Sequence, residues 1–329
     1  MSLTFLKTAA AAVALGGALT MTASSTAVAA DYPSRPITIV VAYPAGQAVD
    51  LLARVIGEGL SRELGQSIVV ENRAGAGGVI GTQYLKRTKP DGYTIAMSSS
   101  GPLAIAPQLY KSAAYDPRAD FSPIMNIAAM ANVLVVRAAS EYHSVGDLIA
   151  AAKARPDQIN FGSPATGSTS HLTQEMLKQL AGVKMMHVPY KGTPAALSDL
   201  LGGQIDALFD ASASVKPFVD KGELRALAVT SAAPIPALPD VQPLSKQGFD
   251  NFEAIGWMGM IGPAGMDPAA VKTLHAALAK VMQDPATLAK LDELGMLPIG
   301  DTPEQFGAFI ASEYQKWGDV IRKADVKVE

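Results

Sequence analysis

The sequence has 329 residues, no cysteine, 27 lysine and arginine residues and 30 aspartate and glutamate residues, with a formal net charge of −3 at pH 7. The lack of cysteine excludes a disulfide framework and a lipid anchor at a cleavage-site cysteine, and the lack of a basic surplus or a basic run argues against nucleic-acid binding. A chain of this length normally forms one large or two medium domains.

The first 30 residues have the pattern of a secretory signal peptide. They carry one cation, Lys7, and no acid, followed by an apolar run from Ala9 to Leu19 and a small-residue end. A membrane anchor is the weaker alternative, because glycines interrupt this run and it falls short of the roughly 20 apolar residues that a span needs. We predict cleavage near Ala29 or Ala30 and a mature chain that is free and soluble.

Short apolar runs alternate with helix-like patterns along the mature chain. The first third contains, in order, a strand at Ile37–Val41, a helix from about Val49 to Leu64, a strand at Ile68–Val70, a helix from about Val79 to Arg87 and a strand at Tyr93–Met97. The middle contains strands at Ile159–Phe161, Met186–Val188, Ala207–Phe209 and Leu224–Val229. The end contains an apolar strand at Ile255–Ile261 and two closing helices, about Pro268 to Met282 and Pro303 to Lys323. This repetition predicts an α/β fold with a mostly parallel sheet wrapped by helices, and two lobes fit it better than one long sheet.

Every glycine-rich segment follows one of these expected strands. In open α/β sheets, ligands bind beyond the carboxyl ends of the strands, where loops enter helices. The loops in question are Tyr43–Asp50, Ala74–Gly78, Ser98–Gly101 and Asn160–His171. If they converge on one cleft, they form a polar pocket that is nearly neutral.

The loop Asn160–His171 is the most distinctive of the four. It packs two glycines, one proline and five hydroxyl side chains into twelve residues and leads into the helix-like Leu172–Leu177. Glycines let the backbone approach a ligand, hydroxyls cap or donate, and the first N–H groups of a helix carry the positive end of its dipole. We therefore expect an anion-binding turn that holds carboxylate or phosphate without a fixed charge.

The same loops weaken most enzyme interpretations. Gly162 and Gly167 have the spacing of a phosphate-binding loop, but Ser168 stands where that loop needs lysine. The segment Gly75–Gly81 resembles a dinucleotide fingerprint, yet its third glycine comes one residue late and no partner acid is identifiable, so a tight turn explains it better. The histidines have no spacing that puts two imidazoles on one helix face, which disfavours zinc.

A secreted serine esterase is the alternative function that we retain. Ser168 or Ser170 beside His171 supplies a nucleophile and a base. However, the chain has no G-x-S-x-G elbow, and His171 is better explained as a structural residue at a helix start. A third possibility is a purely structural protein of the cell envelope that binds no ligand.

Three charged residues each allow two interpretations. Asp50 is four residues before Arg54, so the two can pair on a helix, or Asp50 faces the cleft and holds the loop or meets a ligand. Asp210 ends its strand either in the cleft or in solvent. Arg73 either serves a ligand carboxylate or stays on the surface. The strand around Trp257 is expected in the core.

The chain resembles a known family. The resemblance is carried by ordered motifs that span the mature chain: Tyr43–Gly46 with Asp50 and Arg54, Val70–Gly78, Pro90–Tyr93, Gly162–Pro164 with Gly167–Ser168 and His171–Leu172, Val188–Gly192, and Leu201–Asp206. These motifs are similar to those of the Bug family, the extracytoplasmic solute receptors of tripartite tricarboxylate transporters.

The resemblance implies a two-lobed periplasmic binding protein, type II-like, in which each lobe has a central mostly parallel sheet and the ligand lies between the lobes. Applied to this chain, lobe 1 comprises residues 31–131 and 253–329, and lobe 2 comprises residues 132–252. The ligand of such a receptor is a small carboxylate: a dicarboxylate, a tricarboxylate, an amino acid or an aromatic acid. The predicted contacts are Tyr43, Ala45, Gln47, Asp50, Ser98 and Ser99 on one wall, and Thr166, Gly167, Ser168, Thr169, Tyr190 and Asp210 on the other.

One departure from the family pattern lies in the first loop. Members of the family commonly carry a further glycine and a hydroxyl residue there, whereas this chain has Gln47, Ala48 and Val49. A narrower, partly apolar pocket follows, and the water-mediated carboxylate contact typical of the family is in doubt at this loop.

The resemblance also implies partners and a location. The protein would be a periplasmic monomer, not an enzyme, without cofactor or metal. It would capture its ligand by lobe closure and would then be recognised by the membrane permease subunits of the transporter, or by a signalling partner if no permease is dedicated to it.

Overall fold

The computed structural model describes residues 32–328. The predicted signal peptide, residues 1–30, lies outside this range. Among the described residues, no helix has both the length and the apolar character needed to cross a membrane.

The strands are β1 (Ile37–Val41), β2 (Ile68–Asn72), β3 (Thr94–Ser99), β4 (Phe121–Arg137), β5 (Asn160–Ser163), β6 (Met186–Pro189), β7 (Ala207–Ala211), β8 (Leu224–Val229), β9 (Ile255–Pro263) and β10 (Leu297–Pro298). The helices are α1 (Ala48–Leu64), α2 (Val79–Lys86), α3 (Ala106–Leu109), α4 (Val145–Ala154), α5 (Thr169–Ala181), α6 (Thr193–Gly202), α7 (Ser212–Asp220), α8 (Pro268–Val281), α9 (Pro285–Glu293) and α10 (Pro303–Ala324). Three short turns complete the set: the 3-10 turns η1 (Ala76–Gly78) and η3 (Leu244–Lys246) and the π-helical turn η2 (Gly101–Ile105).

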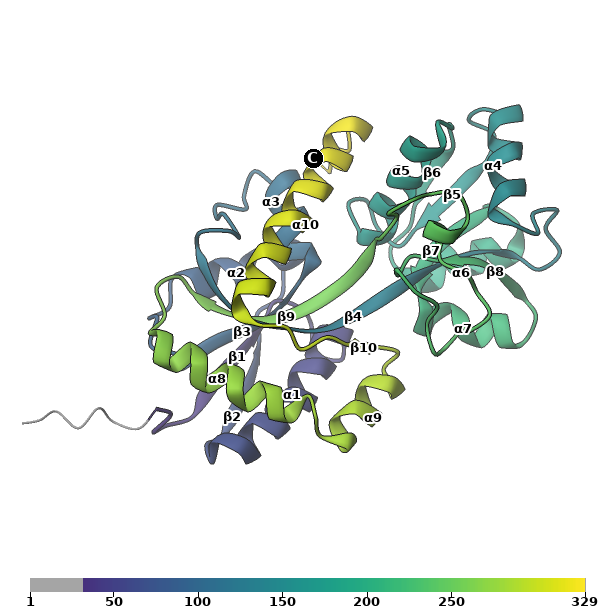
Figure 1. Cartoon of the computed structure of the whole chain (residues 1–329). Helices are drawn as coiled ribbons and strands as arrows, with labels where there is room; N and C mark the ends of the chain where they lie inside the picture. Colours follow the sequence, from purple (N-terminus) through teal and green to yellow (C-terminus); the bar gives the residue numbers. More distant parts are fainter. Residues whose placement is uncertain (1–31, 329) are drawn as a thin grey trace, which may run out of the picture. The chain divides into compact units, whose positions relative to one another are not determined.

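Two groups of parallel strands are joined by long antiparallel ones (Figure 1). Strand β1 lies between β2 and β3 and is parallel to both. Strand β5 lies between β6 and β7 and is likewise parallel to both. Antiparallel pairs link the groups, because β3 pairs with β9, β9 with β4, and β4 with β7. The strands β8 and β10 also pair with β4, so β4 takes part in both groups.

Strand β4 changes partners in its middle. Ala131 lies opposite Ile255 of β9, and the next residue, Asn132, lies opposite Ala211 of β7. This change coincides with the lobe boundary expected from the sequence, and we keep the division into residues 31–131 plus 253–329 and residues 132–252 as a proposal.

Helix α1 shows how an amphipathic pattern becomes a packed element. Its apolar residues recur every three or four positions, and Leu52, Ile56 and Leu60 are fully buried. Gly65 ends the helix in the left-handed conformation that glycine adopts without strain. On the outside of the β1–β2–β3 group, α1 lies beside α8 (Figure 1).

Helix α10 is fixed to β9 by a buried polar cluster. The indole N–H groups of Trp257 and Trp317 both donate to one oxygen of Glu313, each at 2.9 Å. Lys316 pairs with the other oxygen of Glu313, so this nearly buried carboxylate has partners on both sides. The expectation that Trp257 belongs to a core strand is confirmed.

Most elements expected from the sequence are present within one or two residues of their expected ends. The main differences are elements of the structure that were not expected. The long strand β4 was not expected, and the chain closes with three helices, because α9 precedes α10. The α/β class is confirmed.

Candidate functional site

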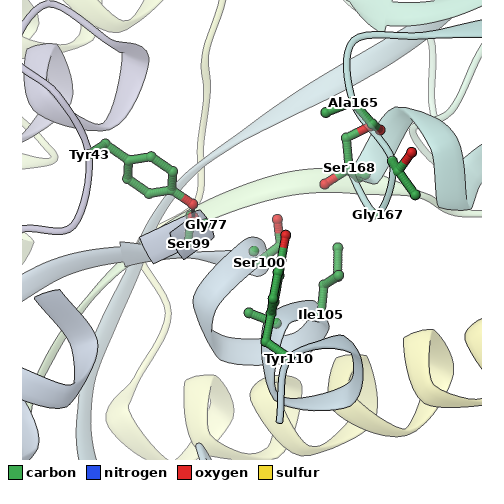
Figure 2. Close-up of a pocket in the computed structure, with 13 residues that line it drawn as sticks. Tyr43, Gly77, Ser99, Ser100, Ile105, Tyr110, Ala165, Gly167 and Ser168 are labelled. Atoms are coloured by element: carbon green, nitrogen blue, oxygen red, sulfur yellow. Dashed lines mark hydrogen bonds between the residues drawn. The ribbon is translucent and has the colours of Figure 1, made fainter. Parts of the chain in front are cut away.

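The cavity that carries the functional argument has a volume of about 370 Å³ and is lined by loops from both strand groups. Its lining residues are Tyr43, Gly77, Ser99, Ser100, Gly101, Ile105, Ala106, Tyr110, Ala165, Thr166, Gly167, Ser168 and Thr169. Figure 2 shows Tyr43, Ser99, Ile105 and Tyr110 on one side and the loop with Ala165, Gly167 and Ser168 on the other. No charged side chain is among these lining residues.

The loop between β5 and α5 forms one wall. Ser168 is the N-cap of α5: its hydroxyl accepts the backbone N–H of His171 at 3.2 Å and donates to the carbonyl of Ala165 at 2.7 Å. Gly167 has a φ of 74°, which favours glycine and turns the chain into the helix. The first N–H groups of a helix have no intrahelical partner, so this wall offers neutral donors and the positive end of a dipole.

His171 supports this wall from behind. It is buried in the first turn of α5, and its Nδ1 accepts the backbone N–H of Gly167 at 3.0 Å. Its ring stacks on that of His187, with centroids 3.7 Å apart. Nε2 of His187 in turn lies 2.6 Å from the hydroxyl of Ser163. The interpretation of His171 as a structural helix-start residue is confirmed.

The serine esterase alternative finds no support in this geometry. The hydroxyl of Ser170 donates to the carbonyl of Phe209, and that of Ser168 donates to the carbonyl of Ala165. Nδ1 of His171 is already bonded to Gly167. Within residues 32–328, neither serine hydroxyl is hydrogen-bonded to the imidazole that would have to act as its base.

Tyr43 and Ser99 form the opposite wall. The Tyr43 hydroxyl and the Ser99 hydroxyl are 2.9 Å apart and hydrogen-bonded. Burial raises the pKa of Tyr43 above its ordinary value, and the hydrogen bond to Ser99 offsets part of this effect. Both groups are therefore neutral hydroxyls at physiological pH, able to donate to and accept from a ligand.

Three predicted contacts in and beside the first loop do not line the cavity. Ala45 and Gln47 are exposed, and Gln47 is the N-cap of α1 without a side-chain hydrogen bond. Asp50 is buried and bonded to Arg54, as its spacing predicted, and it also accepts the backbone N–H of Gly46 at 2.8 Å. Asp50 therefore pairs with Arg54 and holds the loop at the same time.

The remaining predicted contacts also lie outside the lining. Ser98 is buried behind Ser99 in β3. The Tyr190 hydroxyl donates to Asp199 at 2.8 Å. Asp210 is buried in β7, where burial raises the pKa of its carboxyl. Of the twelve predicted contacts, the six that the cavity brings together are Tyr43, Ser99, Thr166, Gly167, Ser168 and Thr169.

Sequence reasoning missed the apolar part of the lining, formed by Ile105, Ala106 and Tyr110. These residues follow the expected third loop and belong to the turn η2, helix α3 and the residue after it. Their apolar character predicts a core segment, and Ile105 and Ala106 are indeed buried in the core although they also line the cavity. Gly77, Ser100 and Gly101 lie in loops that the sequence did single out.

Metal binding and a ligand role for Arg73 find no support in the cavity. Among the described residues, no group of three or more histidine, cysteine or acidic residues is arranged to hold a metal ion. Arg73 pairs with Glu71 at 2.6 Å and stacks over Tyr84, away from the lining.

Comparison with known proteins agrees with this architecture. Residues 52–326 match the family described as TctC, tripartite tricarboxylate transporter family receptor. Protein BugT of Bordetella pertussis is 37% identical over 299 residues, which cover 91% of this chain and 92% of BugT.

Two solved structures extend the comparison. Periplasmic binding protein BugD is 33% identical with a TM-score of 0.73, and the match covers 91% of this chain and 100% of that one. The R. palustris protein Rpa4515, solved with adipate, is 34% identical with a TM-score of 0.76, and the match covers 90% and 99%. The expected two-lobed periplasmic binding protein fold is confirmed.

Proposed function

Because this chain belongs to the TctC family of tripartite tricarboxylate transporter receptors, as a receptor of the Bug type, we propose that it captures a small carboxylate between two lobes and delivers it to a transporter of that type. Proteins of this family are solute-binding receptors and not enzymes, in agreement with the expectation from the sequence. The ligand class, the delivery step and the contacts are our proposal.

The cavity is the observation that carries the proposal. Its two walls set the α5 N-terminus, with Thr166, Ser168 and Thr169, opposite the hydroxyls of Tyr43 and Ser99. Backbone N–H groups at a helix N-terminus bind carboxylates well, and hydroxyls add neutral donors. Neutral donors suit a receptor, since a buried arginine pair would slow the release that transport requires.

We propose that the ligand closes the protein by bonding to both walls at once. In the open state only one wall reaches the carboxylate, so the ligand binds the closed state more tightly and shifts the population toward it. The chain passes between the proposed lobes within β4, at Ala131 and Asn132, and again just before β9, and these two crossings would absorb the motion. The closed monomer would then be recognised by permease subunits, or by a signalling partner, in the periplasm after removal of the leader near Ala29 or Ala30.

A thermal-shift screen tests the proposal. Mature protein should be unfolded and refolded to strip co-purified ligand and then screened against dicarboxylates, tricarboxylates, amino acids and aromatic acids. A true ligand at a hundred times its Kd should stabilise the protein by about 2.7 kcal/mol. Flat melting curves across the whole panel would count against carboxylate capture, and mass spectrometry of ligand released from freshly purified protein would identify the natural one.

A matched pair of variants localises the binding. Ser99→Ala removes a cavity hydroxyl, whereas Ser231→Ala removes an equally buried hydroxyl that donates to the carbonyl of Ala233. We expect Ser99→Ala to weaken binding about tenfold, because a hydrogen bond to a charged group is worth about 1.5–3 kcal/mol. Ser231→Ala should leave the affinity unchanged. If the two variants changed the ligand affinity equally, the ligand would not be in contact with Ser99.

A further inference from the structure

The apolar wall of the cavity carries an inference about the ligand itself, which rests on the proposed function. We infer that, among small carboxylates, this chain selects a monocarboxylate whose apolar body packs on Ile105, Ala106 and Tyr110. The charged end of the ligand would lie at the turn before α5, and the other end would carry no charge.

The wall is built by a local departure from α-helical geometry. Residues Gly101–Ile105 form a π-helical turn that continues into α3, and such turns often occur at functional sites. Ile105 and Ala106 are each 3% exposed and belong to the hydrophobic core, so only a small part of each faces the cavity, and Tyr110 is the most exposed of the three apolar lining residues. The ring of half-buried Tyr110 lies beside Gly77, where an added Cβ would be in ordinary contact with the ring at 3.6 Å.

Glycine at position 101 lets the wall formed by Tyr43 and Ser99 meet the apolar wall. A Cβ at Gly101 would lie 2.8 Å from the Tyr43 hydroxyl, which is closer than real Cβ contacts. The hydroxyls of Tyr43 and Ser99 therefore lie directly beside the start of the turn that carries Ile105. A ligand held by these hydroxyls and by the α5 N-terminus extends its remaining surface over the apolar side chains (Figure 2).

The charges around the cavity argue against a second carboxylate on this wall. None of the lining residues is a cation. Arg54 and Arg73, on the neighbouring α1 and after β2, already pair with the carboxylates of Asp50 and Glu71. Lys111, which follows Tyr110, is exposed to solvent and does not line the cavity. A second ligand carboxylate against Ile105 would lose hydration and would meet on this wall only the neutral hydroxyl of Tyr110, which leaves most of the cost of its burial uncompensated.

Calorimetry with matched acids tests this selectivity on stripped wild-type protein. Hexanoate and adipate share a six-carbon chain and differ in the second carboxylate. We expect hexanoate to bind at least about tenfold more tightly than adipate, and benzoate to bind through contact of its ring with Tyr110. Adipate binding as tightly as hexanoate, or a dicarboxylate, tricarboxylate or amino acid of the panel binding more tightly than both hexanoate and benzoate, would overturn the inference and leave the proposed function standing. No binding of any acid would overturn both.

A cation on the apolar wall should reduce or abolish the preference for hexanoate over adipate. Tyr110→Arg is expected to shift the hexanoate-to-adipate affinity ratio about tenfold or more toward adipate. Leu180→Arg adds the same charge at an exposed site, roughly 16 Å along α5 from Thr169, and should leave the ratio unchanged. If Tyr110→Arg does not fold, Tyr110→Gln replaces it, and this variant should weaken the binding of hexanoate more than the binding of adipate. A ratio unchanged in a folded Tyr110 variant would show that this wall does not select the ligand.

Discussion

Asp50 is the residue on which the loop between β1 and α1 depends. Its side chain is almost fully buried, and its two oxygens accept hydrogen bonds from Arg54, from the Gly46 N–H and from the Asn72 amide. Burial by itself raises the pKa of this carboxyl, but these hydrogen bonds outweigh burial and lower it to about 2. The folded state therefore stabilises the ionised form of Asp50.

Replacing this carboxylate should reduce stability in a pH-dependent way. The folded pKa lies below the ordinary value of 3.8, so the stabilisation is present above that value and is lost as pH falls toward about 2. We expect Asp50→Asn to cost about 2 kcal/mol near neutral pH and about half as much near pH 3. Urea unfolding of both proteins at the two pH values measures the difference.

An exposed pair with the same spacing provides the control for Asp50. Asp220 pairs with Lys216, also four residues apart, but its side chain is 55% exposed. Asp220→Asn should therefore change the free energy of unfolding by less than about 0.5 kcal/mol at either pH. A cost for Asp50→Asn that matched this control, or that did not vary with pH, would contradict the role given to Asp50.

The site was predictable at some residues and not at others for physical reasons. The pairing of Asp50 with Arg54 follows from helix geometry alone. The bond from Asn72 does not, because the two residues are 22 positions apart and meet only when β1 pairs with β2. The lining by Tyr110 was missed because a single aromatic in an apolar segment has the same pattern whether it faces a core or a cavity.

At the scale of the element, the contact between α1 and α8 depends on a missing side chain. Gly59 lies inside α1, and a Cβ there would be 2.5 Å from Cγ1 of Val281. Val281 is buried and β-branched, so it has little freedom to move away. The glycine is therefore a packing requirement of two adjacent helices.

Two alanine substitutions separate helix propensity from packing. Alanine in place of helical glycine normally gains up to about 1 kcal/mol. At Gly59→Ala we expect the steric clash with Val281 to outweigh this gain, so that the free energy of unfolding falls by about 1–3 kcal/mol. At Gly146→Ala, an exposed position of α4, the atom nearest to the added Cβ would be 3.5 Å away, and the protein should become slightly more stable. Thermal unfolding of both variants measures these changes in stability. A Gly59→Ala variant more stable than the wild type would contradict the role given to Gly59 in packing.

The stacked histidines of α5 and β6 form the second element-scale contact. Burial, and then the positive charge that His171 can carry, lower the pKa of His187 to about 4. Glu175 and Lys178 of α5 face the same pair, and Ser163 of β5 bonds to His187. Because the folded pKa is depressed, neutral His187 stabilises the fold above its ordinary value of 6.5, and this contribution is lost as pH falls toward 4.

Removing the titrating ring should flatten this acid sensitivity. His187→Phe keeps a stacking ring but cannot be protonated. Between about pH 7.5 and pH 4.5, we expect its free energy of unfolding to fall by on the order of 2 kcal/mol less than that of the wild type. His143→Gln, at an exposed position, should keep the wild-type dependence. Denaturant titrations across this range measure the free energy of unfolding at each pH. If this free energy changed with pH in the same way for the wild type and for His187→Phe, His187 would not be the source of the acid sensitivity.

Elements with strong local patterns were predictable, and those that depend on distant partners were not. The strands β1 and β8 are short apolar runs, and the helix ends at Gly65 and Pro303 carry local signals. Strand β4 has 17 residues and contains Ser122–Pro123, a pair that favours a turn in the sequence, and it exists because β9, β7 and β8 each pair with part of it. The π-helical turn before α3 likewise depends on tertiary contacts.

At the scale of the whole molecule, the proposed lobes meet along β4. Thr230 bonds to both the N–H and the carbonyl of Asn132 through its hydroxyl, and its own N–H donates to the same carbonyl. These bonds begin at the residue where β4 leaves β9 for β7. A motion of residues 132–252 against the rest would therefore be taken up beside Asn132 and not within either group of strands.

The chain has no cysteine, so pairs of introduced cysteines can report this motion without background. Lys111 and Lys191 are exposed next to Tyr110 and Tyr190, on the two sides of the proposed lobe division. Spin labels at Lys111→Cys and Lys191→Cys should approach one another when a carboxylate binds, because the ligand is bonded from both walls only in the closed state. Labels at Lys111→Cys and Lys89→Cys, both in residues 31–131, should keep their separation. A ligand that changed both distances equally would place the moving boundary elsewhere, and a ligand that bound with neither distance changed would show that capture does not need closure.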